Sequence, residues 1–188
     1  MRMFVAIDLD DGAKAVVARE QQLAASLAGR SSLKFVNPQQ AHLTLAFLGE
    51  VLPPQAEQVI AAMQEPIAGI SPFRMAFGGL GIFPPLGAPR VLWLGLSEGA
   101  RDVIALQRVV AGRLEALGVR LEDRAFHPHL TIGRWKQARP SDRPSLPAEA
   151  PHASTPSTGG MTVDRVTLYE SRLSSEGPDH IALAHARL

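Results

Sequence analysis

Short runs in which apolar and polar residues alternate dominate the chain, and amphipathic stretches with helical spacing separate them. Residues Arg2 to Asp8 alternate in the manner of a half-buried strand, and Asp10 or Asp11 can cap the helical stretch that follows. Pro53-Pro54 opens a second helical stretch, at the first-turn positions where proline is tolerated. Gly118 ends a third helical stretch, because glycine readily adopts the left-handed conformation that closes a helix.

These patterns predict the order strand, helix, strand, helix, strand, strand, helix, strand, strand, strand. Strands and helices do not alternate strictly, so the prediction is an α+β fold. Residues 136–160 hold five prolines and no apolar periodicity, which predicts an irregular surface segment, with a flap near the site as the alternative. The helices are expected over residues 10–29, 53–67 and 98–117, the first with Val16, Val17, Leu23 and Leu27 facing inward, and the strands over residues 2–8, 42–48, 73–83, 90–96, from 129, 162–173 and 181–188.

Composition narrows the class of protein. The 188 residues are ample for one hydrophobic core and tight for two, so a single domain over residues 1–188 is expected. A content of 46% hydrophobic and 20% charged residues is typical of soluble globular proteins, and the longest apolar runs fall far short of a membrane span. The chain has no cysteine, which excludes a disulfide framework, thiolate catalysis and cysteine-ligated zinc.

The start and the net charge add two expectations. The segment from Met1 to Asp8 is too short for a signal peptide and reaches an acidic residue too early, so a cytoplasmic protein is expected. The protein is also expected to be a monomer. The formal net charge of +1 argues against a large nucleic-acid footprint, which normally shows as a strongly basic face. A small nucleotide or one RNA end remains compatible with it.

One short motif occurs twice and carries the candidate chemistry. The copies are His42-Leu43-Thr44-Leu45 and His129-Leu130-Thr131-Ile132, and each opens an apolar alternation. Because successive side chains of a strand point to opposite faces, the histidine and threonine of each copy share one face, and Leu43, Leu45 and Phe47 share the other. The duplication predicts two pseudo-symmetric antiparallel-sheet lobes with helices outside, each contributing one such strand to a central cleft.

The residue types of this motif fit phosphodiester hydrolysis. Imidazole titrates near neutral pH, so one of two histidines can act as a base while the other acts as an acid. The base takes the proton of an attacking water and the acid protonates the departing sugar oxygen. A threonine hydroxyl two residues along each strand can donate a hydrogen bond to a phosphate oxygen. This scheme requires no nucleophilic side chain, metal or cofactor.

Further segments along the chain extend the pattern into a family resemblance. The chain resembles the two-histidine (2H) phosphoesterase superfamily, and within it the bacterial and archaeal RNA 2',3'-cyclic phosphodiesterases, historically called 2'-5' RNA ligases or LigT-like proteins. The two His-x-Thr blocks are the specific signal, and the resemblance covers nearly the whole length. The matching segments are Arg2 to Asp8, His42 to Glu50, Pro89 to Gly95, Phe126 to Arg134, and Leu168 to Ser171 with the final strand.

The resemblance implies metal-free hydrolysis of an RNA 2',3'-cyclic phosphate to a 2'-phosphomonoester, with reversible 2'-5' ligation as a related activity. It assigns His42 as proton donor to the leaving 3'-oxygen and His129 as base for water, with Thr44 and Thr131 holding the phosphate. Arg134 matches a family arginine, yet strict alternation places it opposite His129, so it reaches the phosphate only if the strand twists or bulges. His180 stands where the family often has a tyrosine, which leaves its contact with substrate open.

Several residues admit two interpretations. His127 could pair with His129 on a metal, but metal sites usually need three or more protein ligands, so a loop residue held by Pro128 is favoured. The pair Gly79 and Gly81 lacks the third glycine and helix of a nucleotide loop, which favours a bend in a strand. Trp93 and Phe47 could stack on a base, although Trp93 is expected in the core. Arg90, Arg124, Lys136 and Arg139 could form a basic rim or be solvated charges, and His152 is expected to be exposed.

Two other functions remain open at this point. The same site could act on a small cyclic nucleotide or a nucleotide-sugar phosphate rather than RNA. Alternatively, the protein could be a non-catalytic module that binds RNA ends and uses the histidines only to grip phosphate. Turnover of a cyclic nucleotide separates catalysis from binding, and a comparison of mononucleotide with oligonucleotide substrates separates the two enzymes.

Overall fold

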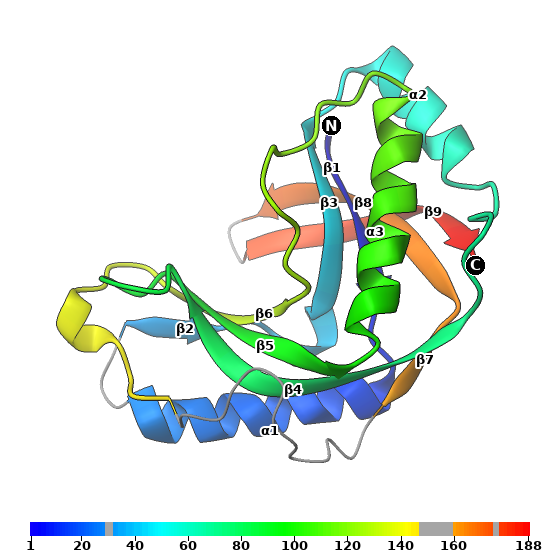
Figure 1. The fold of residues 1–188 in the computed structure, drawn as a ribbon. Coiled ribbons are helices and arrows are strands. Elements are labelled where there is room, and N and C mark those ends of the chain that lie inside the picture. The colour runs from blue at the N-terminus through cyan, green and yellow to red at the C-terminus, as the bar shows by residue number, and fades with distance from the viewer. Residues whose placement is uncertain (29–31, 147–159, 175–176) are drawn as a thin grey trace.

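Two antiparallel sheets form the frame of the molecule in a computed structural model, which describes residues 1–28, 32–146, 160–174 and 177–188 (Figure 1). The four-stranded sheet has the order β3 (His42–Glu50), β1 (Arg2–Asp8), β8 (Arg165–Ser174), β9 (Gly177–Arg187). The five-stranded sheet has the order β2 (Leu33–Phe35), β6 (Leu130–Trp135), β5 (Val91–Glu98), β4 (Phe73–Phe83), β7 (Met161–Val163). The helices of the described residues are α1 (Asp11–Ala28), α2 (Pro53–Ala62) and α3 (Ala100–Glu115), with 3-10 turns at Pro38–Gln40 and Pro140–Asp142.

The predicted α+β architecture with two antiparallel sheets is confirmed, but the lobes are not consecutive halves of the chain. Helix α1 packs against β4 and β6 of the five-stranded sheet, whereas α3, from later in the chain, packs against β3 of the four-stranded sheet (Figure 1). Strand β2 also joins the five-stranded sheet, away from β1 and β3. Each sheet is therefore completed by elements from the other part of the sequence.

Element boundaries differ from the prediction where the chain changes sheets. The strand predicted over residues 162–173 is divided at Asp164, because β7 pairs with β4 in one sheet and β8 pairs with β1 in the other. Strand β9 begins at Gly177, earlier than predicted, since it pairs with β8 along its length. Helix α2 ends at Ala62 rather than near Ile67, whose amide instead donates to the Arg187 carbonyl at 2.7 Å.

The buried face of α1 lies on a different line of the helix from the one predicted. Val16 and Val17 are buried, as expected, but Leu23 and Leu27 are exposed. At 3.6 residues per turn the stripe that contains Val17 continues through Gln21, which turns Leu23 away from the sheet. The buried positions of this helix are Ala13, Val16, Val17, Gln21 and Ala24.

Strand β1 is buried on both faces, not half-buried. Its residues from Met3 to Ile7 are all buried, including Phe4, which lies on the face turned toward the cleft. A central strand with both faces covered loses the alternation of a surface strand. Phe4 is covered because other rings pack on it, and these rings belong to the candidate site described below.

The proline-rich segment is described only in part. Residues 136–146 contain the 3-10 turn Pro140–Asp142 and no strand, in agreement with the predicted irregular structure. Arg143 ties this part to the loop between β4 and β5, because its guanidinium donates to the carbonyls of Gly87 at 3.1 Å and Pro84 at 2.6 Å. Residues 147–159, with His152, lie outside the described residues. None of the described helices is long and apolar enough to cross a membrane.

Candidate active site

The two motif histidines are held in the same way. The Nδ1 atom of His42, at the start of β3, lies 2.9 Å from the carbonyl oxygen of Gln40. The Nδ1 atom of His129, just before β6, lies 2.7 Å from the carbonyl oxygen of His127. A carbonyl oxygen can only accept, so each Nδ1 must carry the hydrogen. Each Nε2 is therefore free to accept a proton from, or donate one to, a ligand.

Local sequence produces each of these carbonyl contacts. Asn37 caps the turn Pro38–Gln40, and its side chain accepts a hydrogen bond from the Gln39 amide at 3.0 Å. This turn fixes the peptide of Gln40 two residues before His42. In the second copy Pro128 separates His127 from His129, and a residue that precedes proline is restricted to an extended backbone. Two different devices thus present a carbonyl to the equivalent ring nitrogen.

Aromatic rings surround His42 on the four-stranded sheet. The ring of Phe4 stacks under His42 with centroids 4.9 Å apart, and Tyr169 stacks on Phe4 at 5.2 Å. The ring of His180, from β9, meets His42 edge-on at 5.0 Å. These contacts leave His42 partly buried and fix the plane of its imidazole.

A carboxylate network lies behind this ring cluster. Asp8 is the register partner of His42 in the pairing of β1 with β3. Its two carboxylate oxygens accept hydrogen bonds from the hydroxyls of Thr167 at 2.5 Å and Tyr169 at 2.6 Å. The Thr167 hydroxyl lies 2.9 Å from Nδ1 of His185. Because the hydroxyl donates to Asp8, Nδ1 of His185 must be the donor in that contact.

His129 has a different aromatic surrounding on the five-stranded sheet. Phe83 meets it edge-on at 5.2 Å, and the Trp93 ring lies 6.3 Å away. Trp93 is buried, as predicted, and lies over Gly81, where an added Cβ would come within 2.0 Å of the indole. Gly81 lies within β4, which agrees with a bend in a strand rather than a nucleotide loop. His127 is exposed and packs edge-on against Trp93 at 5.1 Å.

The two motif strands meet at a cleft of about 650 Å³, the catalytic cleft. Thr44 from β3 lines it together with His129 and Thr131 from the β6 segment. The ring of Phe47, predicted to point away from Thr44, lines it as well and is 53% exposed. The pairing of β1 with β3 skips Leu45, and this register shift reverses the alternation beyond that point.

A second register shift brings Arg134 into the cleft. The pairing of β5 with β6 skips Ile132, so the side chain of Arg134 turns to the face of Thr131 instead of the opposite face. Arg134 is exposed and lines the catalytic cleft. Its positive charge acts on both histidines, since it contributes to lowering the pKa of His42 and of His129.

Gln21 in α1 fixes the β6 segment around Ile132 through hydrogen bonds, a role that was not identified from the sequence. Its side-chain amide, buried in α1, donates to the carbonyl of Ile132 at 3.0 Å and to that of Val36 at 2.7 Å. The Val36 amide also donates to the Ile132 carbonyl, at 3.0 Å. A polar residue on the buried stripe of a predicted helix is the one signal in the sequence that points to such a role.

Burial has the largest effect on the pKa of both motif histidines. It lowers the pKa of His42, an effect that the Gln40 carbonyl and the Asp8 charge oppose and that the charges of His180 and Arg134 reinforce. Burial likewise lowers the pKa of His129, opposed by the His127 carbonyl and reinforced by the charges of His127 and Arg134. Burial lowers the pKa of His180 too. Burial and the bond to Asp8 raise the pKa of Tyr169 far above its usual range.

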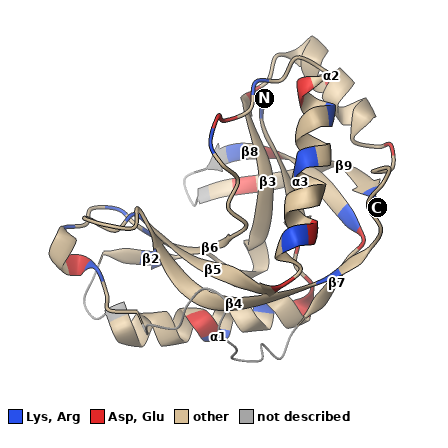
Figure 2. Cartoon of the chain, in the orientation of Figure 1, with Lys and Arg blue, Asp and Glu red and all other residues tan. Residues whose placement is uncertain are grey.

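The predicted basic rim is present in part. Arg90 and Arg124 line the catalytic cleft, whereas Lys136 and Arg139 do not belong to its wall. In the view of Figure 2 basic and acidic residues are mixed over the helices. Among the described residues there is no group of three or more His, Asp or Glu side chains that could hold a metal ion.

Known proteins are similar in sequence to this chain over most of its length. A family model of the 2'-5' RNA ligase superfamily matches residues 9–174. An RNA 2',3'-cyclic phosphodiesterase from Archaeoglobus fulgidus is 36% identical over 180 residues, which cover 95% of each chain. A protein of the same name from Methanothermobacter thermautotrophicus is 33% identical over 188 residues, covering 100% of this chain and 99% of the relative.

Solved structures share the fold. A crystal structure of a Thermus thermophilus protein superposes with a TM-score of 0.75 at 28% identity, covering 100% of this chain and 98% of the other. Escherichia coli LigT in its apo form superposes with a TM-score of 0.74 at 26% identity, covering 100% of this chain and 96% of the other. With the family model spanning most of the sequence and relatives above 30% identity aligned along it, the chain belongs to the 2'-5' RNA ligase superfamily, the two-histidine phosphoesterases that its duplicated motif resembles.

Proposed function

We propose that this chain is an enzyme that hydrolyses the 2',3'-cyclic phosphate at an RNA end to a 2'-phosphomonoester. The observation that carries the proposal is the duplicated imidazole arrangement, in which each of two sheets presents a histidine with Nδ1 engaged and Nε2 free. Thr44, Thr131 and Arg134 line the catalytic cleft with His129, and the Arg134 charge acts on both imidazoles. The names of the curated relatives support the same reaction for this chain.

The reaction needs two proton transfers and one bond exchange at phosphorus. Nε2 of His129 accepts a proton from water, whose oxygen then bonds to phosphorus. The bond from phosphorus to the 3'-oxygen breaks, and Nε2 of His42 gives its proton to that oxygen. The products are a 3'-hydroxyl and a 2'-phosphomonoester, and a later proton exchange with solvent resets both rings.

The other polar groups stabilise the charge on the phosphate. The hydroxyls of Thr44 and Thr131 donate hydrogen bonds to its non-bridging oxygens, where negative charge increases in the transition state. The guanidinium of Arg134 offsets the same charge and can do so with paired donors. The bound phosphate in turn opposes the effect of Arg134 on the two imidazoles and raises the pKa of both.

The surroundings of the histidines favour His42 as the acid. The Asp8 carboxylate favours the protonated form of His42, and no carboxylate is among the groups that shift the pKa of His129. His180 opposes Asp8 only while His180 itself is protonated, and burial lowers the pKa of His180. When His180 is neutral, the Asp8 charge acts on His42 without this opposition.

Product analysis on a defined substrate tests the proposal. We expect the purified protein to convert an RNA with a 2',3'-cyclic phosphate to one with a 2'-phosphomonoester, and to do so in the presence of EDTA. Binding without turnover would indicate a module for RNA ends. Activity lost with EDTA and restored by a divalent cation would assign His127 and His129 to a metal. Light scattering checks the expected monomer, since one chain supplies both histidines.

A further inference from the structure

A second cavity adjoins the catalytic cleft and is not explained by hydrolysis of the cyclic phosphate alone. Its volume is about 710 Å³. The two cavities share Phe47, Leu121, Glu122 and Arg134 in their walls. The second cavity adds Arg2 at the start of β1, Arg120 and His180. A groove with cationic side chains therefore continues from the candidate active site across the strands of the four-stranded sheet.

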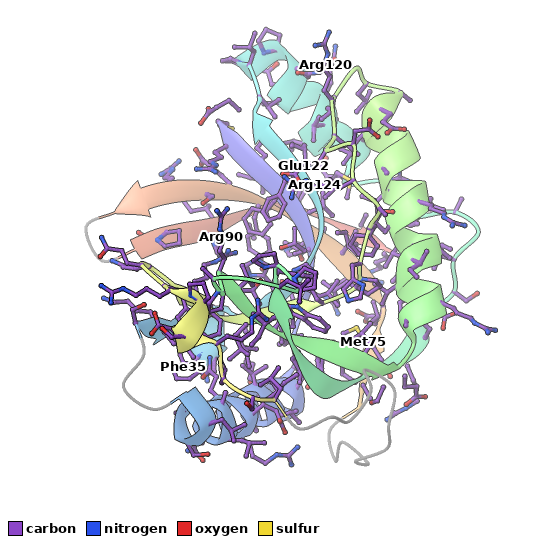
Figure 3. All side chains as sticks on the ribbon, turned by 60° about the vertical axis from the view of Figure 1, so that its left-hand side comes forward. Phe35, Met75, Arg90, Arg120, Glu122 and Arg124 are labelled. Atoms are coloured by element: carbon purple, nitrogen blue, oxygen red, sulfur yellow. The ribbon has the colours of Figure 1, made fainter. Side chains whose placement is uncertain are left out.

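The connection between α3 and β6 links the two cavities along one side. Arg120, Glu122 and Arg124 follow one another along it at every second position (Figure 3). Arg120 lines the second cavity, Arg124 lines the catalytic cleft, and Glu122 lines both. The Glu122 carboxylate lies 3.9 Å from the Arg124 guanidinium, and both side chains are exposed. Glu122 therefore partly neutralises Arg124 rather than Arg120. Arg120 is exposed and lines the second cavity together with Arg2 and with Arg134, which the two cavities share.

An exposed aromatic ring stands at the boundary between the cavities. The ring of Phe47 is 53% exposed although its neighbours Ala46 and Leu48 are buried. Single-stranded RNA ends are commonly bound by stacking of unpaired bases on such rings, with arginines along the phosphate backbone. An exposed ring between two cation-lined cavities is the arrangement that this mode of binding requires.

We infer that the second cavity binds the nucleotide that precedes the cyclic end, and that Arg2 and Arg120 contact the phosphodiester which joins the two nucleotides. The inference rests on the proposed function, because it takes the cyclic phosphate to lie at the two histidines. Arg134, in the walls of both cavities, then lies between the cyclic phosphate and this phosphodiester. The occupant is a single-stranded RNA end of at least two nucleotides, and the cavity makes such an end a better substrate than a cyclic mononucleotide.

The test compares kcat/KM on three substrates. These are a 2',3'-cyclic mononucleotide, a dinucleotide that ends in the same cyclic phosphate, and that dinucleotide with an uncharged methylphosphonate linkage. We expect the normal dinucleotide to exceed the mononucleotide by about tenfold or more, since hydrogen bonds to charged groups contribute effects of this size. The uncharged linkage should remove most of that advantage without any change in the protein.

Two variants locate the effect in the second cavity. Arg120→Ala, and more strongly Arg120→Glu, should lower the ratio of dinucleotide to mononucleotide kcat/KM about tenfold, and Arg2→Ala should lower it less. The matched control is Arg108→Ala, an exposed arginine of α3 outside both walls, which should keep the ratio. The dependence of log(kcat/KM) on log salt should be steeper for the dinucleotide, by about 0.7 for each phosphate contact, and Arg120→Ala should reduce this difference.

The outcomes are distinguishable from failure of the proposed function. If no cyclic substrate is turned over, the proposed hydrolysis is wrong. If the mononucleotide and the normal dinucleotide are turned over at equal kcat/KM, or if the uncharged linkage keeps the full advantage, hydrolysis stands and the second cavity is not a nucleotide site. The inference is also overturned if Arg108→Ala lowers the ratio as much as Arg120→Ala.

Discussion

The surroundings of the two motif histidines differ although the contacts of their rings are the same. Each donates Nδ1–H to the carbonyl two residues earlier, at 2.9 Å for His42 and 2.7 Å for His129. His42 lies on stacked rings backed by the Asp8 carboxylate, whereas His129 lies edge-on to Phe83 beside His127. The carbonyl two residues before each motif histidine therefore fixes the tautomer in both lobes, and the sheets beneath make the two imidazoles electrostatically unequal.

Removal of either histidine tests whether the two act as one unit. His42→Ala and His129→Ala should each lower kcat by roughly 10² to 10⁴, because each removes one proton transfer. The double variant should lose less free energy of activation than the sum of the two single losses. Steady-state kinetics on one cyclic substrate measures all three. Strict additivity would mean that the rings act independently.

A sulfur substitution then separates the two roles. A substrate with sulfur in place of the leaving 3'-oxygen needs little protonation of its leaving group. It should rescue His42→Ala and leave His129→Ala inactive. The opposite pattern would reverse acid and base, and rescue of neither would contradict the acid-base scheme.

The two threonines should matter less than the histidines and about equally. Thr44→Ala and Thr131→Ala each remove one hydrogen bond to the phosphate and leave both proton transfers in place. We expect a loss of about 10- to 100-fold in kcat/KM, the range for hydrogen bonds to charged groups. Thr44→Ser and Thr131→Ser keep the hydroxyl and serve as matched controls. A serine variant as impaired as its alanine counterpart would point to packing rather than hydrogen bonding.

Asp8→Asn should make the two lobes more alike. Burial lowers the pKa of both histidines, so both limbs of the kcat/KM profile should lie below the range of free imidazole, about 6.5. Loss of the Asp8 charge lowers the pKa of His42 further and moves only its limb to lower pH. If His42 is the acid, this is the alkaline limb, because activity falls as the acid loses its proton.

Tyr169→Phe is the control for this profile. It removes one hydrogen bond to Asp8 and keeps the carboxylate, so its limbs should move less than those of Asp8→Asn. Movement of the acid limb in Asp8→Asn would identify His42 as the base. Equal movement of both limbs would show that Asp8 does not distinguish the lobes.

Gln21→Leu should give the smallest loss of activity and affect only the second lobe. The variant removes the Gln21 donor from the Val36 carbonyl and one of two donors from the Ile132 carbonyl, which destabilises the fold by about 1 to 3 kcal/mol. It also loosens the shifted segment that turns Arg134 into the cleft, so KM should rise a few-fold more than kcat falls. Denaturant unfolding and steady-state kinetics check both effects. Gln22→Leu, at an exposed neighbouring position, should change neither.

The sequence predicted those features that local patterns determine. His42, Thr44 and Thr131 lie on their predicted strands, and His129 lies directly before β6 rather than on it. These placements were within reach because a repeated motif and the alternation of a strand are properties of consecutive residues. Their chemical roles stay predictions until the variants are measured. Phe47 was placed on the wrong face because its orientation depends on a register shift that the partner strand imposes.

Features that depend on contacts between distant segments of the chain could not be predicted from the sequence. Arg134 turns into the cleft through the shift at Ile132, whose carbonyl is held by Gln21 from α1. Likewise, Asp8 meets its partners Thr167 and Tyr169 only when β8 pairs with β1. No periodicity or local motif brings residues so far apart in the chain together.

The exchange of elements between the lobes has a consequence for how the protein folds. Helix α1 and strand β2 complete the sheet that holds His129, and α3 covers the sheet that holds His42. Neither lobe corresponds to one contiguous fragment of the chain. Most contacts in the molecule join residues far apart in the sequence, a topology associated with slow folding. We expect the two halves to unfold in one cooperative transition, visible as coincident loss of secondary structure and of catalytic activity in denaturant. The duplicated motif thus looks modular in the sequence, but we expect the molecule that carries it to unfold as one unit.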